Sequence, residues 1–169
     1  MFRRSRLLLL ALVVTAGMFV LPAAEAPAAD GTEVLAFNVR GRGPQEPSAP
    51  PGRFVRTFDV YPITGGARIG TVVQDFAFTS ATTGDHIMTF RLADGEFVNH
   101  TVLSFAPDTA HSGFVFTGLH PDTDTIVPER GSGRYAGRRG RIRMAGWHDV
   151  NHFPEVAVLD DFYVIELDR

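Results

Sequence analysis

The chain has 169 residues, a formal net charge of −3, 44% hydrophobic residues, no cysteine and no lysine. This length suits one domain better than two. The slight acidic excess argues against a general nucleic-acid binder, because such proteins carry a basic excess. The lack of cysteine excludes thiolate nucleophiles and cysteine metal sites, and the lack of lysine excludes Schiff-base catalysis.

The first 28 residues have the layout of a secretory signal peptide. Three arginines at positions 3, 4 and 6 precede the apolar run Leu7–Leu21, and small residues with prolines follow. The run is shorter than the roughly 20 residues of a membrane span, although an uncleaved N-terminal anchor is the alternative. Cleavage after Ala28, within the window 26–30, leaves the domain 29–169. We therefore expect a secreted chain that is free of the membrane after cleavage. Apart from histidine, every basic residue is arginine, and alanine, glycine and proline are frequent. This composition indicates a bacterial source.

After residue 30 the chain consists of short apolar runs interrupted by glycine, proline and aspartate, and no segment keeps a 3.6-residue period. Phenylalanine is plentiful, with 14 copies, and suits a pleated surface. The pattern predicts an all-β domain. The predicted strands are Thr32–Gly41, Arg53–Pro62, Arg68–Ser80, Asp85–Asp94, Glu96–Phe105, Ser112–Leu119, a short strand within Thr125–Gly137, Arg138–Val150 and Asp161–Arg169.

Turn signals connect these strands. The segment Gly41–Gly52 is proline-rich and is predicted to be a loop. Asp94-Gly95 predicts a tight hairpin, because both residues tolerate positive φ. Eight or nine antiparallel strands in a chain of this length favour a single eight-stranded antiparallel β-barrel of the calycin-like kind, because closure removes exposed edges. A two-sheet sandwich is the competing architecture.

The segment Arg130–Gly146 is rich in arginine and glycine. It has no Gly-Lys-Ser/Thr, and its glycine spacing does not open a helix, so it is not a nucleotide loop. From Arg138 onward arginines alternate with Gly140, Ile142 and Met144, which predicts a strand with arginine in water and apolar residues inside. The glycines predict a tight bend, with Tyr135 closing one end of the barrel.

The order of three motifs resembles the allene oxide cyclase barrel-like superfamily, which includes the dirigent proteins. The motifs are "RIGTVVQDF" (Arg68–Phe76), "FRLADGEFVNHTVLSF" (Phe90–Phe105) and "GSGRYAGRRGRIRM" (Gly131–Met144), followed by "FYVIEL" near the C-terminus. The resemblance implies an eight-stranded barrel that is often a homotrimer and holds a small hydrophobic ligand without a cofactor. Cyclases of the family use a first-strand glutamate, an asparagine and a cysteine. By this resemblance, Asn38 matches the position of the family's asparagine, Ala36 stands at the position of the glutamate, and this chain has no cysteine. Plant-type cyclase chemistry is therefore not expected.

Strand alternation adds candidate ligand-binding residues to Asn38. Gln74 and Phe76 share one face of their strand, and His86 and Met88 share one face of the next, with His86 at the rim. Either Asn99 or His100 faces the lumen, depending on the register. For each polar residue the alternative is a hydrogen-bonded core position. No catalytic residue is assigned.

The six histidines form no metal signature, so no metal and no cofactor are expected. The leading hypothesis is a lumen that binds a small hydrophobic molecule and steers its cyclisation or isomerisation by holding a reactive conformer. The alternatives are a non-catalytic dirigent-like or lipocalin-like ligand-binding barrel, and a structural barrel with a filled interior. The size of any cavity separates the last hypothesis from the other two.

Overall fold

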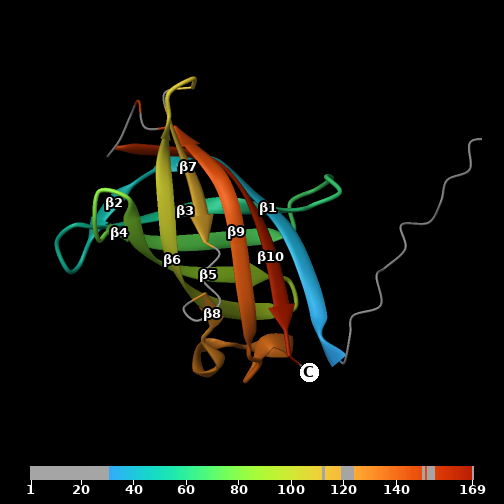
Figure 1. Ribbon diagram of the computed structural model, residues 1–169. Coiled ribbons are helices and arrows are strands. Elements are labelled where there is room, and N and C mark those ends of the chain that lie inside the picture. Colours follow the sequence, from blue (N-terminus) through green and yellow to red (C-terminus); the bar gives the residue numbers. More distant parts are fainter. Residues whose placement is uncertain (1–30, 112, 119–123, 150, 152–154, 169) are drawn as a thin grey trace, which may run out of the picture.

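A computed structural model describes residues 31–111, 113–118, 124–149, 151 and 155–168. The predicted signal peptide lies outside these residues. The fold is all-β and forms a closed eight-stranded antiparallel barrel, as the alternation predicted (Figure 1). The strands are β1 (Glu33–Pro44), β2 (Glu46–Ser48), β3 (Arg53–Pro62), β4 (Gly70–Phe78), β5 (Thr83–Leu92), β6 (Gly95–Asp108), β7 (Gly113–Gly118), β8 (Thr125–Ile126), β9 (Gly140–Asp149) and β10 (Val156–Leu167).

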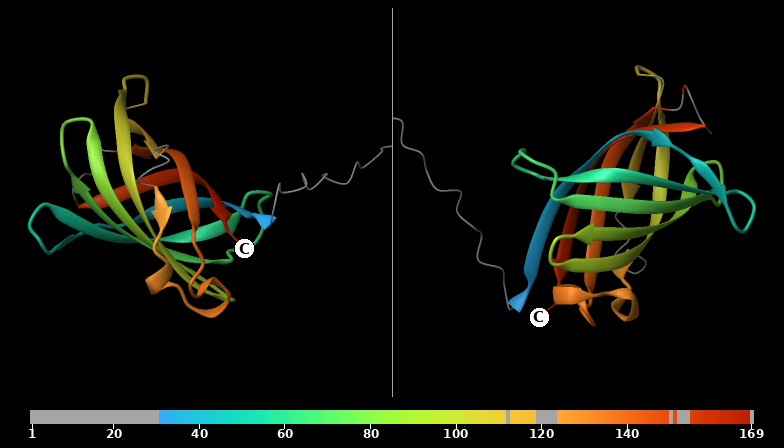
Figure 2. Two further views of the ribbon diagram at one scale, coloured as in Figure 1. Left: turned by 60° about the horizontal axis from the view of Figure 1, so that its bottom comes forward. Right: turned by 180° about the vertical axis from the view of Figure 1, so that it is seen from behind.

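The barrel closes through β1, which pairs with β10 along its whole length and with β3 over Phe37–Arg40. Seen from behind, β3, β4 and β5 cross steeply over β1, β9 and β10 (Figure 2). Two short strands complete the wall. β2 extends the sheet beside β3, and β8 bridges β6 and β9 below the end of β7. Closure satisfies the backbone groups that an open sheet leaves unpaired.

The inward-facing positions form one aromatic-rich core. Phe90, Phe97 and Tyr163 have no exposed surface, and the rings of Phe90 and Phe97 stack with their centroids 4.8 Å apart. On β9, Ile142 and Met144 are buried and Arg141 and Arg143 are exposed, as predicted. Each fully buried phenylalanine contributes about 1.5–3 kcal/mol to folding, so this core is the main source of stability.

Several strand boundaries differ from the prediction. The proline-rich segment Gly41–Gly52 is partly strand, because β1 runs to Pro44 and β2 follows; prolines are tolerated there because these residues lie at strand ends or at an edge. The last strand begins at Val156 and not at Asp161. The predicted hairpin is present, but Leu92 pairs with Gly95, which puts Ala93 and Asp94 in the turn.

The glycine-rich bend packs backbone against backbone under the barrel. A Cβ on Gly133 would collide with the carbonyl of Asp94, and one on Gly131 would collide with the carbonyl of Tyr135. This tight packing allows η3 (Gly133–Tyr135) to insert the Tyr135 ring beside Phe97, with centroids 5.1 Å apart. Tyr135 is 2% exposed, and the segment that contains η3, drawn in orange, lies across the lower end of the barrel (Figure 1), so the glycines serve packing.

The buried hydroxyl group of Tyr135 should make the folded protein less stable at alkaline pH. Its hydroxyl donates to Asp94 at 3.1 Å, and burial, with a smaller effect from this bond, raises the pKa of Tyr135 to about 12. An unfolded tyrosine has a pKa of about 10, so the unfolded chain loses this proton first. The stability that the neutral phenol gives is complete below about pH 10 and is lost as the pH rises towards about 12.

A spectrophotometric titration of tyrosinate checks this expectation. The folded protein should show a late-titrating phenol that is missing from Tyr135→Phe. Ionisation of Tyr135 near pH 10, the value of an unfolded tyrosine, would contradict it.

Candidate functional site

An aromatic cavity of about 270 Å³ lies at the end of the barrel opposite Tyr135. Phe76 and Phe78 come from β4 and Phe114 and Phe116 from β7, so two strands supply its aromatic wall. The other lining residues are Ala157, Arg56, His148 and Asp149. The interior is therefore not filled throughout, which argues against a purely structural barrel.

A ring of hydrogen-bonded side chains, here called the polar ring, stands against this cavity. Its members come from four strands and are Arg56 (β3), Gln74 (β4), His148 (β9), Asp161 and Tyr163 (both β10). All five side chains are at most 5% exposed. They point inward because each has the same parity as the apolar core residues of its own strand.

The hydrogen bonds run from Arg56 to Asp161 by two routes. Along the first, Arg56 Nε donates to Gln74 Oε1 at 2.8 Å, Gln74 Nε2 donates to the Tyr163 hydroxyl at 3.1 Å, and that hydroxyl donates to Asp161 Oδ2 at 3.1 Å. Along the second, Arg56 Nη2 lies 3.4 Å from His148 Nδ1, and His148 Nε2 lies 2.9 Å from Asp161 Oδ1. The ring thus joins a buried cation to a buried anion through neutral groups.

The hydrogen bond between His148 and Asp161 indicates which ring nitrogen of His148 carries the hydrogen. The Asp161 carboxylate only accepts, so Nε2 carries the hydrogen and donates it. Nδ1 then holds a lone pair and faces Arg56. Burial lowers the pKa of His148, and Asp161 opposes that change only in part, so the imidazole is neutral at physiological pH.

Arg56 has donors left over. A guanidinium carries five N–H groups, and Nη1 donates one to Gln45 Oε1 at 3.2 Å in addition to the two bonds of the ring. Within the described part of the chain, one N–H on each terminal nitrogen therefore has no acceptor. Burial lowers the pKa of Arg56, because the site removes the guanidinium charge from water. A ligand with an acceptor oxygen fits these free donors.

Burial and hydrogen bonding also hold the phenol of Tyr163 in its neutral form. Burial raises the pKa of Tyr163 well above its ordinary value, and the neighbouring Asp161 adds to the increase. The phenol therefore keeps the hydrogen that it donates to Asp161 at neutral pH.

Gly146 makes room for the carboxylate of the ring. Gly146 on β9 is paired with Asp161 on β10, and a Cβ at Gly146 would overlap the Asp161 carboxylate. Close approach of a side chain to a backbone is a role that only glycine fills without strain.

The structure divides the five predicted ligand-binding residues. Gln74, Phe76, His86 and Met88 all point inward and are at most 2% exposed. Gln74 belongs to the polar ring and Phe76 lines the cavity, whereas Met88 packs in the core. Asn38 alternates with the buried Phe37 and Val39 and so lies on the outer face, away from the lumen. The alternation of β1 therefore removes Asn38 from the candidate site.

The register also places the remaining polar candidates. Asn99 is inside and donates to Thr101 at 2.9 Å, whereas His100 is on the outer face beside Asp85. His86 is fully buried, and not at the rim, because Phe76 and Thr101 are its strand neighbours. Burial, with the charge of Arg56, lowers the pKa of His86 well below its usual value. Neither of its ring nitrogens has a hydrogen-bond partner among the described residues.

The sequence pattern did not lead us to predict Arg56, His148, Asp161 or Tyr163 as site residues. The signal was nevertheless present for three of them: Arg56 shares parity with Phe58 and His148 with Met144, and Asp161 opens the alternating run of Tyr163, Ile165 and Leu167. A charged or ionisable residue on the apolar face of a strand is the feature that identifies such a site.

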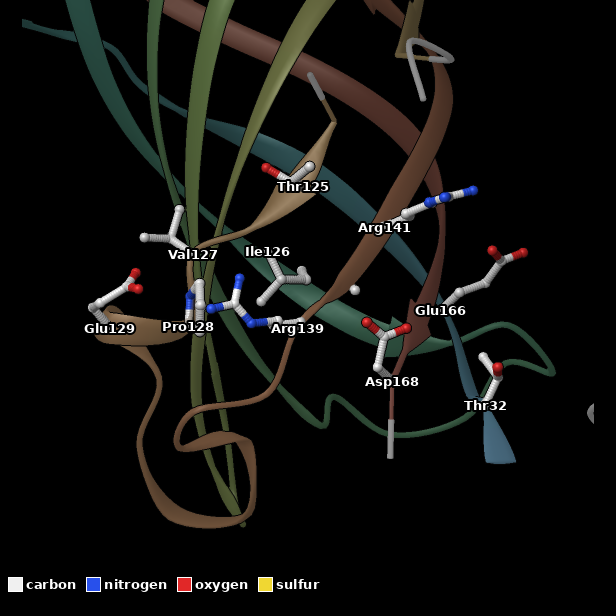
Figure 3. Close-up of a pocket in the computed structure, with 11 residues that line it drawn as sticks. Thr32, Thr125, Ile126, Val127, Pro128, Glu129, Arg139, Arg141, Glu166 and Asp168 are labelled. Carbon is white, nitrogen blue, oxygen red and sulfur yellow. The ribbon is translucent and has the colours of Figure 1, made fainter. Parts of the chain in front are cut away.

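A larger hollow, of about 760 Å³, lies on the outside near the chain's C-terminal end. Figure 3 shows Arg139 extending towards the Val127–Glu129 segment, whereas Arg141 and Glu166 extend to the other side. Charges of both signs stand there in contact with water, where electrostatic interactions are weak. We therefore assign the candidate site to the smaller, mainly apolar cavity at the end of the barrel.

No group of three or more histidine, aspartate and glutamate side chains is arranged to hold a metal among the residues that the structure describes. In the same residues, no helix has the length and apolar character needed to cross a membrane. No family model matches the chain, and no curated protein matches its sequence.

Proposed function

We propose that this protein binds a small, largely apolar molecule in its barrel, with an acceptor oxygen of that molecule directed at Arg56. The observation that supports the proposal most strongly is the pair of free N–H donors on Arg56, a residue that is 5% exposed and lines an aromatic cavity. A buried donor without an acceptor costs about 1–3 kcal/mol, and a ligand oxygen removes that cost.

The shape and lining of the cavity define the class of ligand. Its volume lies near the lower end of the roughly 300–1,000 Å³ range of small-molecule sites. The phenylalanine rings supply apolar and edge-to-face contacts, which favour a flat, unsaturated or aromatic molecule. Because Asp161 already balances the charge of Arg56, a neutral carbonyl group fits better than a second anion.

The sequence resemblance supports the same proposal. Allene oxide cyclases and dirigent proteins hold small apolar molecules inside a barrel, and the order of the motifs in this chain is similar to theirs. We propose that this chain is a secreted, distant member of that superfamily, because its first 28 residues have the layout of a signal peptide.

Filling the cavity should abolish binding. Ala157 on β10 lines the cavity and is 5% exposed, so Ala157→Leu places three additional carbons in the space of the ligand. We expect at least about a tenfold loss of affinity for small aromatic ketones, measured by ligand-observed NMR, because apolar contacts are replaced by overlap.

Ala145→Leu is the matched control. Ala145 lies on the outer face of the neighbouring strand, so the same added bulk should leave affinity unchanged. Equal binding by Ala157→Leu and the wild type, or no binding of any aromatic carbonyl by the wild type, would contradict the proposal.

A further inference from the structure

We propose that the polar ring makes this cavity a proton-transfer site, in which His148 removes a proton from the carbon next to a carbonyl group and Arg56 holds the resulting enolate oxygen. The inference rests on the proposed function, because the substrate must occupy the aromatic cavity. It adds a reaction class, which is enolisation and isomerisation of apolar ketones or aldehydes.

His148 is positioned as the base by its contacts. Asp161 accepts the Nε2 hydrogen through both carboxylate oxygens, at 2.9 and 3.1 Å, and this fixes the tautomer that leaves a lone pair on Nδ1. The imidazole also stacks on Phe116, with ring centroids 4.0 Å apart, and this prevents the ring from turning. A base held in one orientation beside a substrate cavity is what general-base catalysis needs.

Arg56 is positioned to stabilise the charge that forms. Its Nη2 lies 3.4 Å from Nδ1 of His148, which is a long and weak hydrogen bond. Both residues line the cavity. A carbonyl oxygen that binds the N–H groups of Arg56 displaces this weak hydrogen bond, and the neighbouring carbon then lies beside the lone pair of Nδ1. Donors aimed at a developing oxyanion are among the strongest contributions to catalysis.

The reaction balances without any further reagent. The carbon–hydrogen bond beside the carbonyl breaks, and the proton moves to His148 Nδ1. The electrons of that bond form a carbon–carbon double bond, and the π electrons of the carbonyl group move to the oxygen. Asp161 stabilises the imidazolium, and Arg56 stabilises the enolate. The hydrogen on His148 Nδ1 exchanges with solvent, and His148 then protonates either the same carbon, which gives exchange, or the far end of a conjugated enolate, which moves the double bond.

Tyr163 and Gln74 act as positioning residues. The Tyr163 hydroxyl holds Asp161 Oδ2, and Gln74 joins that hydroxyl to Arg56 Nε, so the base and the oxyanion donor keep a fixed separation. Precise placement of reacting groups is worth several orders of magnitude in rate.

Deuterium exchange into β-tetralone in D₂O tests the proposal. This probe has an aromatic ring for the cavity, a ketone for Arg56 and an acidic methylene between the two. We expect the wild-type protein to accelerate exchange at that methylene, followed by NMR, and His148→Gln to lose about 10²–10⁴-fold of the acceleration. Below the pKa of His148 the rate should fall, because a protonated imidazole has no lone pair.

Two variants keep the result interpretable. His100→Gln is the matched control, because His100 also pairs with an aspartate, Asp85, but on the outer face of the barrel; its exchange rate should equal that of the wild type. Ala157→Leu leaves the ring residues unchanged and fills the cavity, so exchange should disappear together with binding, even where His148→Gln folds poorly.

The outcomes distinguish the proposed proton transfer from the proposed ligand binding. Binding of β-tetralone without exchange above the buffer rate would overturn the proton-transfer step and leave ligand binding intact. Exchange that survives in His148→Gln would also overturn it. Failure of the probe and of all other aromatic carbonyls to bind would overturn both proposals.

Discussion

Asp161→Asn should destabilise the barrel by about 3–5 kcal/mol, the cost of leaving a buried charge without its partner. Arg56 is 5% exposed, and Asp161 is the group that most strongly supports its charge. Asparagine also presents an N–H₂ group where the carboxylate accepts bonds from His148 and Tyr163, so one of these donors loses its acceptor. The midpoint of urea unfolding measures the effect.

The neighbouring Asp160 and the partner Arg56 supply the comparisons. Asp160→Asn changes the same charge on the exposed face of β10 and should shift stability by less than about 0.5 kcal/mol. Arg56→Met in the Asp161→Asn background removes the stranded cation and should recover part of the loss. A double variant whose loss equals the sum of the two single losses would show that these charges are not coupled.

Gly146→Ala should cost about 3 kcal/mol of stability and also disrupt the polar ring. The new methyl group would overlap the Asp161 carboxylate, which is buried and held by His148 and Tyr163. The carboxylate must move, and its bond to His148 must then lengthen or break. We therefore expect a lower midpoint of thermal unfolding together with a shifted imidazole signal of His148 in NMR spectra.

Ala145→Leu adds more volume one residue earlier on the same strand, but on the outer face, so it should change neither measurement. A Gly146→Ala protein with wild-type stability and an unchanged His148 signal would show that the carboxylate is not confined in the way the structure describes.

The period-two pattern of the sequence was sufficient to predict the class of fold. In a β-strand successive side chains point to opposite faces, so the run Arg141, Ile142, Arg143, Met144 already separates water from core. The same rule placed Gln74, Phe76 and Met88 inside. Asn38 was placed by resemblance to a motif and not by this rule, although the apolar Phe37 and Val39 on either side of it indicate that Asn38 points outward.

Only the tertiary structure could bring the candidate site together. Arg56 and His148 are separated by 92 positions, and β3 and β9 are not neighbours in the sheet, so no local pattern links them. Their contact depends on closure between β1 and β3 and on the register of each strand pair, and a one-residue slip would turn either side chain outward. The alternation of side chains along a strand is a local property, so the barrel could be predicted from the sequence. The contacts between charged side chains across the lumen depend on how distant strands pack, so they could not.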